Sequence, residues 1–161
     1  VSGRPLAAAH QAEPRPDNPR VALWQATAVL REHRGDGHVA VLVARGIGPI
    51  ESHLLKSGSG ESDEATLKLH RGFPDDEWAA ARAGLVERGW LDADGRLTAR
   101  GVAEHEAVEA ATDAAAEQPW EAIGPAATGR LRDLLDPVAT AIRTSGLIPH
   151  PNPLGMPQPA S

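Results

Sequence analysis

The chain has 161 residues, no cysteine and a formal net charge of −6 at pH 7. This length accommodates one domain with a proper core and is too short for two large ones. Without cysteine, disulfides and thiolate metal sites are excluded, and a reducing cytoplasm is the expected compartment. No run of about 18 apolar residues predicts a membrane span. The negative charge disfavours non-specific attraction to nucleic acid or anionic lipid.

Two helices are predicted in the first part of the chain. Residues 1–17 contain three prolines and no apolar period, which predicts a flexible N-terminal segment. The pair Asn18-Pro19 then predicts a helix start, with Asn as the cap and Pro in the first helical position. Gly35 predicts the end of this helix, and Asp36 is expected to cap the next one.

The middle of the chain is expected to hold short helices and one β-hairpin. Pro49 opens a third helix, and Asp63 caps a fourth. A further helix is predicted over 75–88. The pair Asp94-Gly95, flanked by Trp90-Leu91-Asp92 and Arg96-Leu97-Thr98, predicts a tight turn between two strands. Thr98 then caps a helix that runs to about Glu117.

The rest of the chain is expected to be helical and then disordered. Apolar residues recur at helical spacing from Leu131 to Ile142, and Pro137 is expected to kink or restart that helix. Residues 144–161 hold five prolines and predict a disordered tail, so the ordered domain is expected over 18–143. The four tryptophans, Trp24, Trp78, Trp90 and Trp120, are expected in the core.

The sequence LVERGWLDADGRLTARG resembles the wing region of multiple-antibiotic-resistance-type winged-helix regulators. The longer pattern is similar to an actinobacterial helix-turn-helix family called SalK-like. The matching segments are WQATAVLREHRGDGHVAVLVARG (24–46), RGFPDDEWAAARAGLVERGWLDADGRLT (71–98) and Glu117-Gln118-Pro119-Trp120. The likeness covers roughly residues 15–143 and corresponds to the C-terminal half of the longer relatives. It implies a mainly α fold: a winged helix-turn-helix with one short β-hairpin and additional flanking helices.

The charges conflict with easy DNA binding by such a scaffold. On a helical wheel of 75–88, Trp78 and Leu85 face inward, while the outward face holds two alanines and two carboxylates, namely Asp76, Ala80, Ala83 and Glu87. Between Asp63 and Arg100 there are eight acids and six bases. The candidate DNA contacts are therefore the remaining arginines, Arg82, Arg88, Arg96 and Arg100. The alternative is that these arginines cover apolar surface or pair with nearby acids.

A second candidate site is the segment REHRGDGH, residues 31–38. Its candidate ligand-binding residues are His33, Arg34, Asp36 and His38. Imidazole and carboxylate groups can bind a divalent metal, an anion can bind at a helix N-terminus, and a His-Asp pair can transfer protons. The structural alternative is that Gly35 ends a helix, Asp36 caps the next, and the histidines have no chemical role.

Three functions are compatible with these patterns. The first is a bacterial transcription regulator that binds duplex DNA, as a homodimer formed through its terminal helices. The second is the same scaffold binding a small-molecule ligand or metal at 31–38. The third is a protein-interaction module that uses the alanine-rich helix from Thr98 to Glu117. No catalytic residue is assigned, an enzyme is the less favoured interpretation, and neither a cofactor nor an operator is specified.

Overall fold

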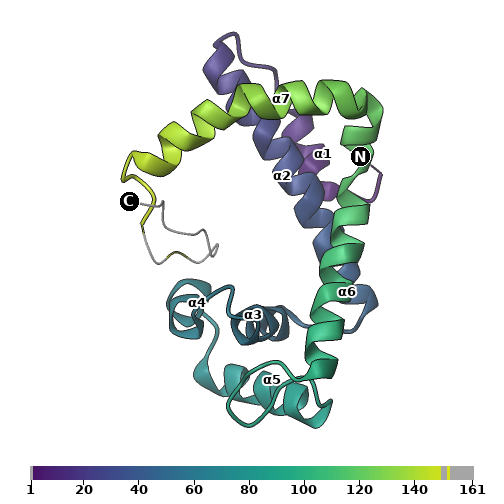
Figure 1. Cartoon of the computed structure of the whole chain (residues 1–161), viewed down its shortest axis with the longest axis vertical. Helices are drawn as coiled ribbons and strands as arrows, with labels where there is room; N and C mark the ends of the chain where they lie inside the picture. Colours follow the sequence, from purple (N-terminus) through teal and green to yellow (C-terminus); the bar gives the residue numbers. More distant parts are fainter. Residues whose placement is uncertain (1, 150–151, 153–161) are drawn as a thin grey trace. The chain divides into compact units, whose positions relative to one another are not determined.

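A computed structural model describes residues 2–149 and 152 of the chain. Within this part the regular structure is helical (Figure 1). Its seven helices are α1 (Pro5–Ala12), α2 (Pro19–Ala44), α3 (Pro49–Gly58), α4 (Glu64–Arg71), α5 (Asp75–Glu87), α6 (Ala99–Ala116) and α7 (Gln118–Thr144). None of them combines the length and the apolar composition that crossing a bilayer requires.

The chain divides into two compact units. The first contains residues Val1–Ile47 and Glu106–Ala122, and the second contains Gly48–His105 and Ile123–Ser161. Helix α6 contributes its C-terminal part to the first unit and its first turns to the second.

Helix α2 is the longest element of the first unit, and it begins as predicted. Asn18 Oδ1 accepts a hydrogen bond from the Arg20 amide at 3.0 Å, and Pro19 takes the first helical position. The predicted stop at Gly35 is wrong, because the helix continues to Ala44. A helical glycine costs only about 1 kcal/mol relative to alanine. The contacts that α1 and α6 make with this part of α2 outweigh that cost.

Helix α1 lies in the stretch for which the sequence predicted a flexible segment. It packs along α2 (Figure 1) and buries Ala7 completely. Asp36 Oδ2, on α2, accepts a hydrogen bond from the Ala7 amide at 3.0 Å. This amide belongs to the first turn of α1, where backbone N–H groups have no partner within the helix. Asp36 therefore caps α1 and not, as predicted, a helix of its own.

The second unit has its core between α3, α4 and α5. Helix α3 packs against both α4 and α5. The Trp78 ring lies edge-on to Phe73, with 6.5 Å between centroids, and is stacked on His53 at 6.2 Å. The side chains buried to 2% exposure or less in this core are Leu54, Leu55, Leu67, Trp78, Leu85 and Leu91.

Residues 90–98 form a tight loop, and the predicted β-hairpin is wrong. Among the described residues there is no strand, only one isolated antiparallel bridge between Leu91 and Leu97. Asp92 Oδ1 accepts hydrogen bonds from the amides of Asp94 and Arg96, each at 2.9 Å, which closes the turn through a side chain. Since α5 ends just before this loop and α6 starts just after it, no residues remain to extend a ladder. The winged form of the fold is therefore not present in the described part, although the mainly α prediction is confirmed.

Helix α6 follows the 90–98 loop directly, and α7 follows α6. Thr98 Oγ1 accepts a hydrogen bond from the Gly101 amide at 3.1 Å, which confirms the predicted cap of α6. In α7 the backbone departs from helical angles at Gly124 and continues as helix through Pro137, where the sequence predicted a kink. Most of the predicted tail, 144–161, lies outside the described residues.

The four tryptophans do not share one role. Trp78 and Trp90 are buried, as expected. Trp24 is 68% exposed and Trp120 is 36% exposed, so neither is a core residue in this structure. They lie on the long helices α2 and α7, where spacing alone could not show which face is covered.

Candidate nucleic-acid interface

Helices α4 and α5 form a helix-turn-helix within the second unit. Asp63 caps α4, because its Oδ2 accepts hydrogen bonds from Thr66 N at 2.8 Å and from Thr66 Oγ1 at 3.0 Å. Gly72 ends the helix in the left-handed conformation, with φ of 67°. Two further residues lead into α5, so the connection has the three-residue length and the glycine typical of this motif.

The exposed face of α5 agrees with the prediction from the helical wheel. Trp78 and Leu85 are buried against the core, whereas Ala80 and Ala83 are exposed. The exposed carboxylates are those of Asp75, Asp76, Glu77 and Glu87. Three of them are in the first turn, where they complement the positive end of the helix dipole. This face can accept hydrogen bonds and make apolar contacts, but it carries no positive charge of its own.

Two of the four candidate arginines form ion pairs within the second unit. Arg82 pairs with Glu64 of α4. Arg88 pairs with Glu51 of α3, and its guanidinium lies 4.4 Å from the centroid of the Trp90 ring. These contacts connect α5 to the two helices beneath it. Arg82 and Arg88 therefore pair with nearby acids, which was the alternative to a DNA contact in the sequence analysis.

Arg96 and Arg100 differ from that pair. Both are exposed, Arg96 in the 90–98 loop and Arg100 in the first turn of α6. Within residues 2–149 and 152 neither side chain forms a hydrogen bond or an ion pair. Their charges are thus available for an external anion such as a phosphate.

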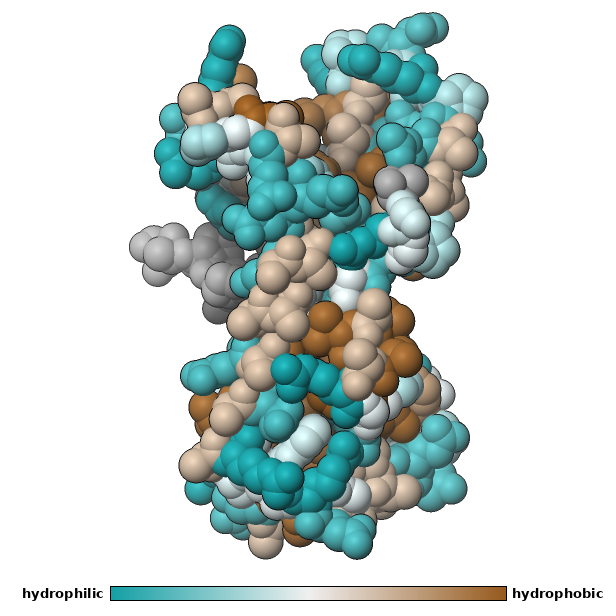
Figure 2. All heavy atoms as spheres, turned by 90° about the vertical axis from the view of Figure 1, so that its right-hand side faces the viewer, coloured by the Kyte–Doolittle hydropathy of each residue, from teal (hydrophilic) through white to brown (hydrophobic). Residues whose placement is uncertain are grey.

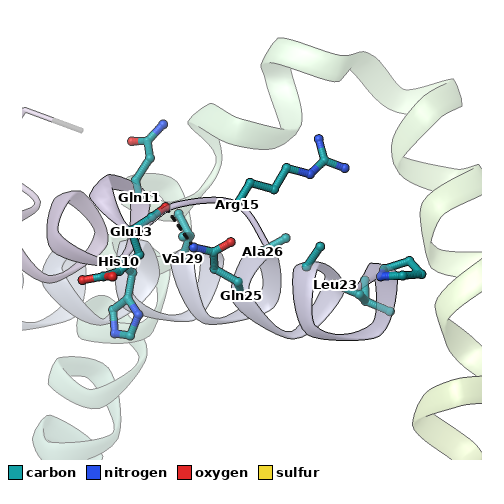
Figure 3. Close-up of a pocket in the computed structure, with 10 residues that line it drawn as sticks. His10, Gln11, Glu13, Arg15, Leu23, Gln25, Ala26 and Val29 are labelled. Atoms are coloured by element: carbon teal, nitrogen blue, oxygen red, sulfur yellow. Dashed lines mark hydrogen bonds between the residues drawn. The ribbon is translucent and has the colours of Figure 1, made fainter. Parts of the chain in front are cut away.

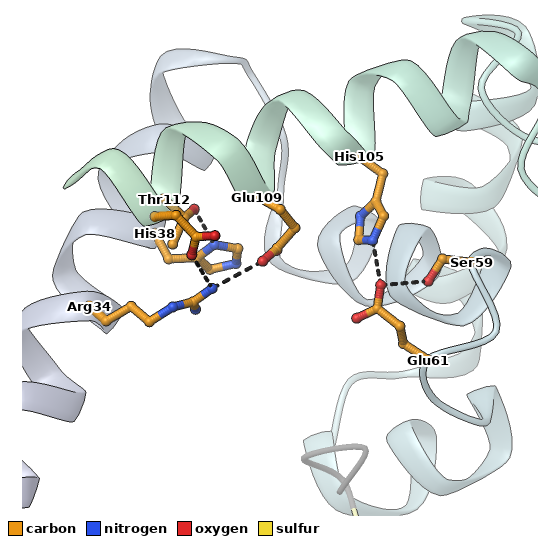
Figure 4. Close-up of polar contacts among 8 residues, drawn as sticks. Arg34, His38, Ser59, Glu61, His105, Glu109 and Thr112 are labelled. Carbon is orange, nitrogen blue, oxygen red and sulfur yellow. Dashed lines mark hydrogen bonds and ion pairs between the residues drawn. The ribbon is translucent and has the colours of Figure 1, made fainter. Parts of the chain in front are cut away.

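The 31–38 segment lies inside α2 and not between two helices. It directs its groups to two different sides of the helix. The His33 carbonyl and the Asp36 carboxylate face the N-terminal segment, where they accept hydrogen bonds from Arg4 and Ala7. Arg34 and His38 face α6 (Figure 4).

The contacts on the α6 side are specific. Arg34 Nη2 lies 3.0 Å from Glu109 Oε2 and 3.3 Å from Asp113 Oδ1. His38 Nδ1 lies 3.0 Å from Thr112 Oγ1, which is completely buried (Figure 4). The side chains of Asp36, Arg34 and His38 are thus used to hold α1 and α6 against α2, whereas His33 contributes its backbone carbonyl. Among the described residues no three His, Asp or Glu side chains are grouped as a metal site.

A groove of about 550 Å³ lies elsewhere in the first unit, between the end of α1 and the start of α2 (Figure 3). Leu23, Ala26 and Val29 line it on the α2 side, and His10 and Glu13 lie on the other side. A hydrogen bond of 3.1 Å from Gln25 Nε2 to the Glu13 carbonyl crosses it. None of the residues 31–38 lines this groove.

Sequence reasoning missed two polar contacts. One is Arg4, whose bonds to α2 and α6 have no local sequence signal. The other is His105, on α6. Its side chain is 14% exposed, and its Nε2 lies 2.6 Å from Glu61 Oε1, which Ser59 Oγ also contacts at 3.0 Å (Figure 4).

The capped α4, the glycine turn and the buried inner face of α5 define a helix-turn-helix protein. Comparison with known families agrees with this class. A family model described as "helix-turn-helix family" matches residues 1–149, and the chain belongs to that family. No curated protein and no solved structure matches the chain.

Proposed function

We propose that this helix-turn-helix protein is a transcription regulator that contacts duplex DNA through α5 and two arginines beside it. Two features of the described part of the chain support the proposal together. The outward face of α5 is exposed, and the exposed arginines Arg96 and Arg100 pair with no acid there. Arginine side chains bind phosphate oxygens and so fix the orientation of a protein on the duplex.

The outward face of α5 limits which bases it can recognise. Alanine side chains make apolar contacts with the methyl group of thymine, and carboxylates accept hydrogen bonds from the amino group of cytosine. Ala80 and Ala83 supply the first kind of group, and Asp76 and Glu87 supply the second. The face has no arginine or asparagine to bind the acceptor edges of guanine or adenine. The expected site is therefore rich in pyrimidines on the contacted strand.

The same charges make binding weak and sensitive to salt. With two arginines available, the slope of log K against log salt concentration is expected to be about −2, since each phosphate contact contributes roughly −0.9. The exposed carboxylates of α5 oppose the approach of the phosphates.

Gel retardation or fluorescence anisotropy with duplexes of random sequence tests the proposal. At about 20 mM salt the native chain should bind, and its affinity should fall as salt rises. The double variant Arg96→Ala/Arg100→Ala should bind more weakly and lose most of the salt dependence. Selection from a random duplex library should then enrich pyrimidine-rich sites.

A matched control removes two positive charges elsewhere. Arg15→Ala/Arg130→Ala changes two exposed arginines outside the helix-turn-helix and lowers the net charge by the same amount. It should bind DNA with a salt slope close to that of the native chain. The proposal fails if the native chain does not bind at low salt, or if both double variants behave alike.

A further inference from the structure

The face of α2 opposite His33 carries an apolar stripe that is exposed in the described part of the chain. Relative to His33, which faces α1, Trp24 lies about half a turn away on the wheel. Val21, Trp24, Ala28, Gly35 and Val39 all fall within about 60° of one another. The larger of these side chains are strongly exposed: Val21 45%, Trp24 68% and Val39 58%.

One ion pair interrupts the stripe at the midpoint of the helix. Arg31 pairs with its neighbour Glu32, and the Arg31 side chain is 70% exposed. The Glu32 carboxylate lies over Gly35, with its Oε2 at 3.7 Å from the place of a Cβ on that glycine. By the same wheel Arg31 lies on one edge of the stripe and Glu32, whose side chain is 16% exposed, lies on the other.

The stripe on α2 is self-complementary when two copies of the helix run in opposite directions. If two copies of α2 lie antiparallel with a two-fold axis between residues 31 and 32, Trp24 faces Val39 of the other copy. Ala28 then faces Gly35, and Arg31 faces Glu32. Apolar residues meet apolar residues, two small residues face each other, and opposite charges meet at the centre.

We propose that α2 is the interface of a homodimer, in which two copies pair antiparallel about an axis between Arg31 and Glu32. A two-fold interface uses the same patch on both subunits, and the stripe has the self-complementarity that this requires. The proposal rests on the α2 face alone and does not depend on DNA binding.

The length of α2 sets the size of such a contact. A helix of 26 residues is about 39 Å long. Trp24 alone offers on the order of 150 Å², and it enters twice in a symmetric pair. Stable interfaces bury roughly 800 Å² per partner, so the pairing must extend along most of the length of α2.

Paired charge variants of the full chain test the antiparallel arrangement. In Glu32→Arg, positions 31 and 32 are both positive, and in Arg31→Glu both are negative. Each variant alone places like charges opposite each other at two points, so its dimer Kd should rise by roughly 100-fold or more. An equimolar mixture should form heterodimers with a Kd within roughly tenfold of the native one. Sedimentation equilibrium over a concentration series measures the Kd of the native chain, of each variant and of the mixture. Circular dichroism checks that each variant is folded.

A control and a second variant complete the experiment. Arg132 and Asp133 form a neighbouring exposed ion pair on α7, so the corresponding variants Asp133→Arg and Arg132→Asp should leave the native dimer unchanged. Because the chain has no cysteine, Ala28→Cys/Gly35→Cys should form a disulfide-linked dimer on oxidation, whereas either single variant should not. A native chain that stays monomeric overturns the proposal, as does a mixture that fails to associate.

Discussion

The guanidinium of Arg4 occupies the space that a Cβ on Gly37 would need. From this position Arg4 Nη1 donates to the His33 carbonyl at 2.8 Å, and Nη2 donates to the Ala115 carbonyl at 2.6 Å. Ala115 lies in the last turn of α6, where carbonyls lack partners within the helix and the dipole is negative. One side chain from the N-terminal segment thus joins α2 to the end of α6, and a glycine at position 37 makes this possible.

Replacing Gly37 by alanine should destabilise the protein. Alanine improves helix propensity by up to about 1 kcal/mol. However, it displaces Arg4 from two charge-assisted hydrogen bonds, each of which contributes roughly 1.5–3 kcal/mol. The expected net loss in the free energy of unfolding is about 2 kcal/mol, measured by urea denaturation. Gly129→Ala is the control, since a Cβ there meets nothing within 4 Å and should be neutral or stabilising.

The capping contact between Asp36 and α1 gives a second prediction. Asp36→Ala removes the acceptor of the Ala7 amide, so α1 should fray, and the free energy of unfolding should fall by about 1–2 kcal/mol. Asp36→Asn keeps an oxygen acceptor and should have a smaller effect. Hydrogen exchange of the amides of residues 7–12 measures the fraying directly. Unchanged protection of these amides in Asp36→Ala would contradict the cap.

The helix N-caps could be predicted from the sequence, whereas features that depend on distant partners could not. Asn18, Asp63 and Thr98 all cap helices as predicted, because an N-cap is determined by residues two or three positions away. The predicted helix stop at Gly35 is wrong, and α1 has no predicted counterpart. Both depend on contacts between α1, α2 and α6 that are remote in the sequence.

The two candidate sites also differ in how far the sequence could predict them. The acidic outward face of α5 followed from the helical period and is confirmed by the exposure of Asp76 and Glu87. The bonding partners of Arg34 and His38 are more than 70 residues away, so no spacing could have shown them. The hairpin prediction failed for another reason. The pair Asp94-Gly95 does make a turn, but the residues beside it are committed to the ends of α5 and α6.

The paired arginines Arg82 and Arg88 should affect stability more than DNA binding. Arg82→Ala and Arg88→Ala each break an ion pair that is about one-third exposed on the arginine side, and Arg88→Ala also removes the stacking on Trp90. We expect a loss of up to about 1 kcal/mol for each, with the larger loss for Arg88. Thermal unfolding measures this change. Like the control Arg15→Ala/Arg130→Ala, the variants Arg82→Ala and Arg88→Ala should bind DNA with a salt slope close to that of the native chain. A slope as shallow as that of Arg96→Ala/Arg100→Ala would show that they contact phosphates.

The contact between Glu61 and His105 makes stability sensitive to acid. Partial burial raises the pKa of Glu61, but hydrogen bonds from His105 and Ser59 and the charges of His105 and Lys56 outweigh it, so the pKa lies below its ordinary value of 4.5. A carboxyl whose pKa is lower in the folded state stabilises the fold above its unfolded pKa and loses that contribution as the pH falls through the folded pKa. The native chain should therefore lose stability as the pH falls below about 4.5, and Glu61→Gln should lose less over that range while being less stable at neutral pH. Urea denaturation at pH 3.5, 4.5 and 6.5 measures both effects.

The control is Glu121→Gln, which changes an exposed carboxyl with no side-chain hydrogen bond within the described residues. This variant should follow the native acid profile. If Glu61→Gln also follows it, the Glu61–His105 contact does not contribute to the stability of the fold.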